Sequence, residues 1–112
     1  MNPSEYAYYI TQDLPNEIAF LSLFAIGQSF VWENNYSDAI ITFDKALESL
    51  PIENSITEWL PFFYELRGFT YLRDGKLEKA IANLNNAIQL DPENALAYYL
   101  RGRAYLDCIM IM

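Results

Sequence analysis

The chain has 112 residues, a length that suffices for one domain with a small core, and its net charge is −8. It contains a single cysteine, Cys108, and no histidine, which excludes an internal disulfide and the usual structural zinc sites and removes the commonest general base. The acidic excess repels phosphate backbones, so we expect no nucleic-acid partner, and no apolar run reaches the roughly 18 residues of a membrane span.

The first segment with helical periodicity covers residues 4–14. Its apolar residues recur at helical spacing: Tyr6, Tyr9, Ile10 and Leu14. Ser4 is placed to cap such a helix. Two interpretations are open: the segment packs as a cap on the helices that follow, or it lies in the protein's own binding groove and competes with a ligand.

Five further helices follow, and local signals mark their ends. Asn34-Asn35 and Asp74-Gly75 interrupt periodic apolar runs and predict turns. Pro51 and Pro92 follow the second run of each pair, where proline commonly ends a helix. The helices that we expect cover residues 16–33, 37–49, 60–73, 77–90 and 95–108.

An internal repeat is the most informative feature of the sequence. The segments Tyr64-Glu65-Leu66-Arg67-Gly68 and Tyr98-Tyr99-Leu100-Arg101-Gly102 share four residues, and their glycines are 34 residues apart. A third copy begins at Gly27. The residues at equal offsets from Gly27 and Gly68 are Phe30 and Tyr71, Ala39 and Ala80, Phe43 and Leu84, Ala46 and Ala87, and Pro51 and Pro92.

The step from Gly27 to Gly68 is 41 residues, seven longer than the other step, so we place an insertion at 54–60. Trp59 in this insertion either anchors a partner or packs under its own loop. Glycine inside a helix costs about 1 kcal/mol relative to alanine. We therefore expect each repeat glycine to mark the close approach of a neighbouring helix, with Ala39 and Ala80 facing Gly27 and Gly68.

These residues resemble the tetratricopeptide repeat (TPR), whose pattern is a large aromatic, a small residue, an aromatic, then Ala, Phe, Ala and Pro. The resemblance covers residues 20 to about 106. It implies an all-α fold, a TPR-like α-solenoid of antiparallel helix pairs with about two and a half repeats. The implied organisation is a capping segment and the start of the first helix at 1–19, a first unit at 20–53, the insertion at 54–60, a second unit at 61–94, and a half repeat or capping helix at 95–112.

The resemblance also implies a binding surface, because the first helix of each TPR unit lines the concave face of the stack. The contacting positions lie six and three residues before the glycine, and one and four after it, which form one helical stripe. With Arg73 beside the stripe, the implied groove residues are Leu21, Phe24, Gln28, Phe62, Glu65, Phe69, Arg73, Leu96, Tyr99 and Arg103. Leu72 and Leu106 also fall on the stripe, where they are equally well explained as core.

The mostly apolar lining predicts a groove for an amphipathic helix or an apolar peptide. Some TPR proteins instead hold acidic chaperone tails in a basic and amide clamp. The clamp is missing here, because the matching positions hold Phe24, Gln28, Leu66, Leu96 and Leu100.

Three classes of function are open, and the first is a non-enzymatic scaffold that binds another protein or peptide. The second is a structural module, either a homo-oligomer or a piece of a longer array, that associates through the groove and the apolar tail at 108–112. A further alternative for this tail is that it folds back as core. The third is an enzyme, but Lys76, Glu78 and Lys79 are better explained as a solvated helix face. We expect no catalysis, metal or cofactor, and, since no basic residue precedes the first apolar stretch, a cytoplasmic location.

Overall fold

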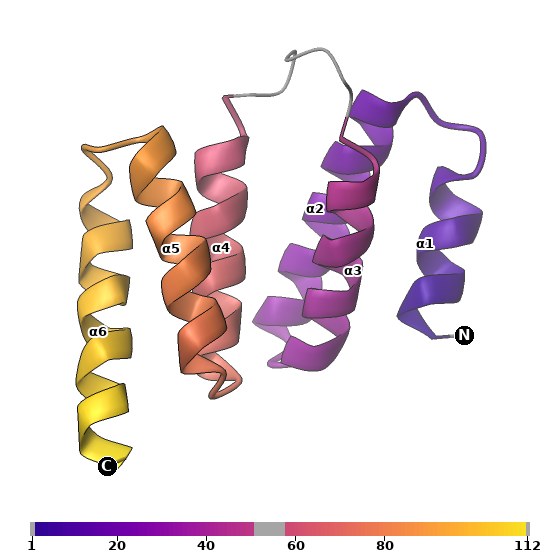
Figure 1. Ribbon diagram of the computed structural model, residues 1–112. Helices are drawn as coiled ribbons and strands as arrows, with labels where there is room; N and C mark the ends of the chain where they lie inside the picture. Colours follow the sequence, from indigo (N-terminus) through magenta and orange to yellow (C-terminus); the bar gives the residue numbers. More distant parts are fainter. Residues whose placement is uncertain (1, 51–57, 112) are drawn as a thin grey trace. The chain divides into compact units, whose positions relative to one another are not determined.

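The computed structural model describes residues 2–50 and 58–111, except for the side chains of Ser4, Tyr6, Ile10 and Ile111. The chain divides into two compact units, Met1–Ile56 and Thr57–Met112. The first contains α1 (Pro3–Thr11), α2 (Asn16–Trp32) and α3 (Tyr36–Glu48), and the second contains α4 (Leu60–Arg73), α5 (Leu77–Leu90) and α6 (Ala95–Ile111) (Figure 1). The described ranges contain no strand, and the all-α class is confirmed. Most of the predicted insertion lies outside them.

The N-terminal helix α1 packs against α3 and α2 within the first unit, with Ala7 buried. Its cap is Asn2 rather than Ser4, so that prediction is wrong. The Asn2 side chain accepts a hydrogen bond from the Glu5 amide (2.9 Å), and the Glu5 carboxylate accepts one from the Asn2 amide (3.3 Å). This reciprocal pair satisfies two amides that a helix start leaves unpaired, and Pro3 needs no amide partner at the first helical position.

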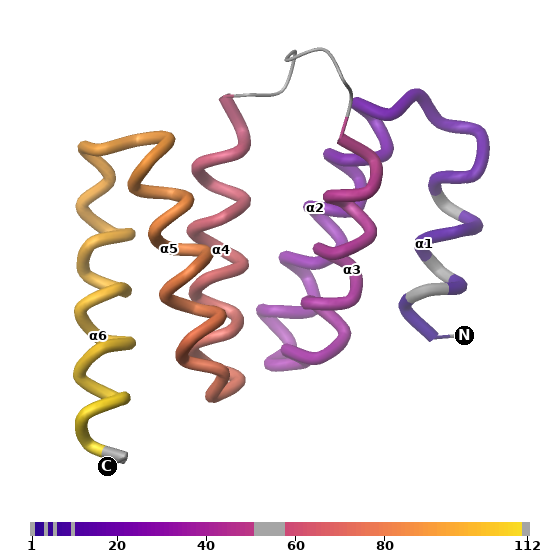
Figure 2. The backbone as a smooth tube through the Cα atoms, in the orientation of Figure 1, coloured from indigo at the N-terminus to yellow at the C-terminus, as the bar shows by residue number. Residues whose placement is uncertain are grey.

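Each helix pair, α2–α3 and α4–α5, reverses direction at an equivalent residue (Figure 2). Asn34 (φ 60°) and Gly75 (φ 81°) both adopt the left-handed conformation, and each stands seven residues after its repeat glycine. Glycine and asparagine adopt this conformation at the lowest cost. The predicted turns at these two places are therefore confirmed.

The third copy of the repeat has Ile109 at the turn position. A β-branched residue is strained at positive φ, so α6 runs on to Ile111 instead of ending at the predicted residue 108. Ile109 and Met110 are 68% and 75% exposed, so the idea that the tail folds back as core is wrong for these two residues.

The repeat glycines of α2 and α4 admit a large side chain from the paired helix. A Cβ added to Gly68 would lie 2.7 Å from Cγ of Leu84, and one added to Gly27 would overlap the ring of Phe43. Leu84 and Phe43 are fully buried at equivalent repeat positions. We call the space over such a glycine a glycine socket. The socket is filled by this large residue, whereas the sequence had led us to expect the small residues Ala39 and Ala80. Ala80 is nevertheless close, since its carbonyl oxygen lies 3.3 Å from the Cβ position at Gly68.

Gly102 has an empty glycine socket, so the close approach predicted there is wrong. Among the described residues, no atom outside the adjoining backbone of α6 lies within 4 Å of a Cβ added to Gly102. The reason is that α4 and α5 contact α6 on the face where Ala97, Leu100 and Ala104 are buried, which is turned away from Gly102. Tyr105 is 50% exposed as a result, whereas its counterpart Tyr71, beneath α5, is 5% exposed.

The two glycines of the second unit should respond oppositely to the same substitution. We expect Gly68→Ala to lower the free energy of unfolding by about 1–3 kcal/mol, because the new methyl group collides with the Leu84 branch point. Gly102→Ala should raise it by up to about 1 kcal/mol through helix propensity alone. Urea unfolding followed by circular dichroism measures both, and equal losses would contradict the assigned sockets.

Candidate functional site

A hollow of about 480 Å³ lies between α4 and α6 of the second unit. The residues that line it are Phe69, Leu72, Arg73, Tyr99, Leu100, Arg103 and Asp107. Four of the predicted groove residues therefore surround one space: Phe69, Arg73, Tyr99 and Arg103. They meet because each helix presents one stripe at a spacing of three to four residues, and α4 and α6 pack directly together.

The apolar wall of this hollow rests on the core of the second unit. Phe69 and Leu72 are half-buried and pack against a buried cluster of Leu84, Ala87, Ala97 and Leu100. Leu72 therefore serves as core and as wall. Tyr99 is 62% exposed at the rim, so its ring is accessible to a bound chain. A wall held by the core keeps its shape before a ligand arrives, which lowers the entropy cost of binding.

The polar part of the hollow consists of two arginines and one carboxylate. Nη2 of Arg103 lies 3.9 Å from Oδ1 of Asp107, one helical turn further along α6, and both side chains are partly exposed. An exposed pair of this kind contributes less than about 1 kcal/mol. Arg103 can therefore exchange Asp107 for a ligand carboxylate at little cost, and Arg73 adds a second positive charge to the same lining.

Glu65 has a structural contact that the sequence did not reveal. Its Oε2 accepts a hydrogen bond from Nδ2 of Asn94 (2.7 Å), and Oδ1 of Asn94 accepts one from the Ala97 amide (3.0 Å). Asn94 thus caps α6 and fastens the start of that helix to α4. The signal was present as an asparagine just before an apolar run, but nothing in the sequence pairs it with Glu65.

The remaining predicted groove residues lie away from the hollow. Phe62 and Leu96 are exposed, and Trp59 stacks near Phe62 with its ring centroid 6.5 Å away. Leu106 is also exposed, so the interpretation of this residue as core is wrong. In the first unit, α2 carries Leu21, Phe24 and Gln28 half-buried, and the Phe24 ring lies 6.2 Å from that of Phe43. A binding role for these residues stays a prediction.

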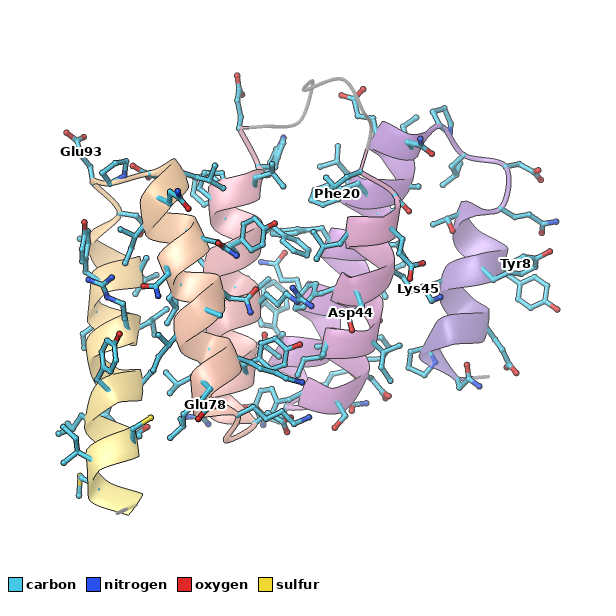
Figure 3. All side chains as sticks on the ribbon, in the orientation of Figure 1. Tyr8, Phe20, Asp44, Lys45, Glu78 and Glu93 are labelled. Atoms are coloured by element: carbon cyan, nitrogen blue, oxygen red, sulfur yellow. The ribbon has the colours of Figure 1, made fainter. Side chains whose placement is uncertain are left out.

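The charged cluster considered for catalysis is spread over the start of α5. Lys76 pairs with Asp74 (3.3 Å), and Nζ of Lys79 lies 5.8 Å above the Tyr71 ring. Glu78 is exposed at the end of α5 opposite the turn that carries Glu93 (Figure 3). In the part of the chain that the structure describes, no three Cys, Asp or Glu side chains gather as metal ligands, and no helix is long and apolar enough to cross a membrane.

Comparison with known proteins supports the repeat found in the sequence. A family model described as TPR repeat matches residues 68–107, which run from the end of α4 through α5 into α6. The matched stretch thus contains all the residues that line the hollow. A search of curated proteins gives no match.

The bridge from Glu65 to Asn94 predicts a measurable loss of stability. Asn94→Ala removes both the cap and the bond to α4, so we expect a cost of about 1 kcal/mol, or a melting temperature lowered by about 4 °C. Glu65→Ala removes only the second contact and should cost less. Glu93→Ala, in the same turn, is the control, and an Asn94→Ala variant that melts like this control would refute the assignment.

Proposed function

We propose that this chain, a tetratricopeptide repeat protein, is a non-enzymatic binding module that holds an amphipathic helix or an apolar peptide in the hollow between α4 and α6. The TPR match supports a role in protein–protein interaction in general. The observation that carries the finer proposal is the lining itself, in which a preformed apolar wall stands beside two cations.

The dimensions of the hollow suit one or two anchor side chains. Its volume of about 480 Å³ lies within the roughly 300–1,000 Å³ of ligand pockets. Burying a large apolar side chain contributes roughly 1.5–3 kcal/mol, so two anchors against Phe69, Leu72 and Tyr99 contribute roughly 3–6 kcal/mol. Micromolar binding needs roughly 8 kcal/mol beyond the cost of association, so a ligand must also contact surfaces outside the hollow. The corresponding stripe of α2, with Leu21, Phe24 and Gln28, is proposed as a further contact surface.

The charges select among apolar peptides. Arg73 and Arg103 outnumber Asp107, so the lining carries a net positive charge within an acidic protein. A ligand carboxylate beside an apolar anchor forms a charge-assisted hydrogen bond with Arg103 and displaces the long contact to Asp107. We therefore propose that the preferred ligand pairs apolar anchors with an acidic residue, whereas a basic amphipathic helix is repelled.

A random 16-residue peptide library displayed on phage tests this function against the full chain. Enriched peptides should carry apolar residues three or four apart beside an acidic residue. Tyr99→Ala should weaken binding of a selected peptide about tenfold without unfolding the protein, because Tyr99 lies at the rim. Tyr9→Ala is the matched control, since Tyr9 is an equally exposed tyrosine on α1. Unchanged affinity in the Tyr99→Ala variant would overturn the groove assignment.

A further inference from the structure

A stripe on the outer side of α6 repeats the surface that α4 presents to α5. It consists of Tyr98, Gly102, Tyr105 and Ile109, at intervals of four, three and four residues, and we call these residues the outer stripe. Such spacing keeps all four side chains on one narrow face of a helix, as in a coiled-coil seam. The corresponding residues of α4 are Tyr64, Gly68 and Tyr71, and Gly75 of the following turn corresponds to Ile109.

No other helix covers Gly102 of the outer stripe in the described part of the chain, although the Arg101 guanidinium of the same helix lies 5.2 Å from the Tyr98 ring. The glycine socket at Gly102 is empty, and Tyr98 is 43% exposed although its counterpart Tyr64 packs against the core. At about 100° per residue, the outer stripe is turned about 110° away from Tyr99 and Arg103, which line the hollow. Figure 1 agrees, because α4 and α5 both lie on the same side of α6. α6 therefore has two separate apolar faces.

In the two complete pairs, the corresponding stripe is covered by the helix that follows the turn, which is α3 over α2 and α5 over α4. In both complete pairs the covering helix follows a left-handed turn at the seventh residue after the glycine. At that position α6 has Ile109 and remains helical.

The outer stripe is complementary to itself when two copies run antiparallel. In the register that places Tyr105 of one copy over Gly102 of the other, the two-fold axis repeats the same contact, and Tyr98 faces Ile109 on both sides. A ring seated over a helical glycine is the contact that Phe43 already makes with Gly27 in the first unit. A parallel pair would instead oppose glycine with glycine and leave both sockets empty.

We propose that two copies of this protein associate through antiparallel α6 helices, with the tyrosine at 105 of each copy filling the glycine socket at 102 of the other. A second copy is the occupant because the stripe itself supplies a counterpart for each of its positions: Tyr105 for the socket at Gly102, and Ile109 for Tyr98. The hollow between α4 and α6 takes no part in this contact, so a dimer that fails to form leaves the proposed peptide binding untouched.

The area available sets the strength of this dimer. A fully buried aromatic side chain covers roughly 150–250 Å², so four half-exposed tyrosines supply roughly 300–500 Å². This is well below the roughly 1,200 Å² of a standard stable interface, even when Ile109 is added. The pair should therefore be weak and reversible, and it should be populated only at high protein concentration.

Sedimentation equilibrium of the full chain from about 5 to 500 µM tests the proposal. The wild-type protein should shift from monomer to dimer in this range, and Ile109→Asp should abolish the shift. Met110→Asp is the matched control, because Met110 is an equally exposed neighbour outside the outer stripe. A monomer at every concentration, or equal loss with both variants, would overturn the proposal, the second result indicating unspecific adhesion of the tail.

A swap of the socket and its occupant tests the register. Gly102→Tyr alone should prevent dimerisation while the helix content by circular dichroism stays unchanged, since the position is exposed and an added Cβ meets no neighbouring element in the monomer. In the double variant Gly102→Tyr with Tyr105→Gly, the new tyrosine at 102 of one copy faces the new glycine at 105 of the other. Each facing pair again has one ring and one socket, so the dimer should return. A double variant that stays monomeric with native helix content would exclude the antiparallel register.

Discussion

Each complete helix pair depends on one large side chain that seats over a helical glycine of the paired helix. Phe43 covers Gly27, and Leu84 covers Gly68, and both occupants are fully buried. A glycine within a helix is unfavourable by about 1 kcal/mol, so its presence here is explained by the contact that a Cβ would block. This contact fixes how closely the paired helices approach, and in the second unit Leu84 also packs with Ala97 and Leu100 of α6 in one buried cluster.

The last helix departs from this rule, and the departure gives α6 two accessible faces. One face, with Tyr99 and Arg103, closes the hollow against α4, while the other, with Tyr105, presents an empty socket. The replacement of a turn residue by Ile109 accounts for the longer helix. Binding of a peptide and pairing of two copies therefore draw on different side chains of one helix, and each can change without the other.

Much of the fold could be predicted because its signals are local. Asn34 and Gly75 marked the turns, and the spacing of glycine, alanine and proline marked the pairs, all of which act over a few residues. The predictions failed where an outcome depends on what covers a residue. Gly102 follows the same Tyr-x-Leu-Arg pattern as Gly68, yet no local pattern says whether a helix lies over it. The same limit hid the bond between Glu65 and Asn94, which are 29 residues apart, and left the roles of Leu21, Phe24 and Gln28 as predictions.

The central claim is that a glycine socket and its occupant act as one unit, and a double-mutant cycle on Gly68→Ala and Leu84→Ala tests it most directly. Truncation of Leu84 alone leaves a cavity that should cost about 2–5 kcal/mol. In the double variant the new methyl group at 68 enters that cavity. We expect the double variant to be more stable than the sum of the single losses by at least about 1 kcal/mol, and losses that add within about 0.5 kcal/mol would contradict the account.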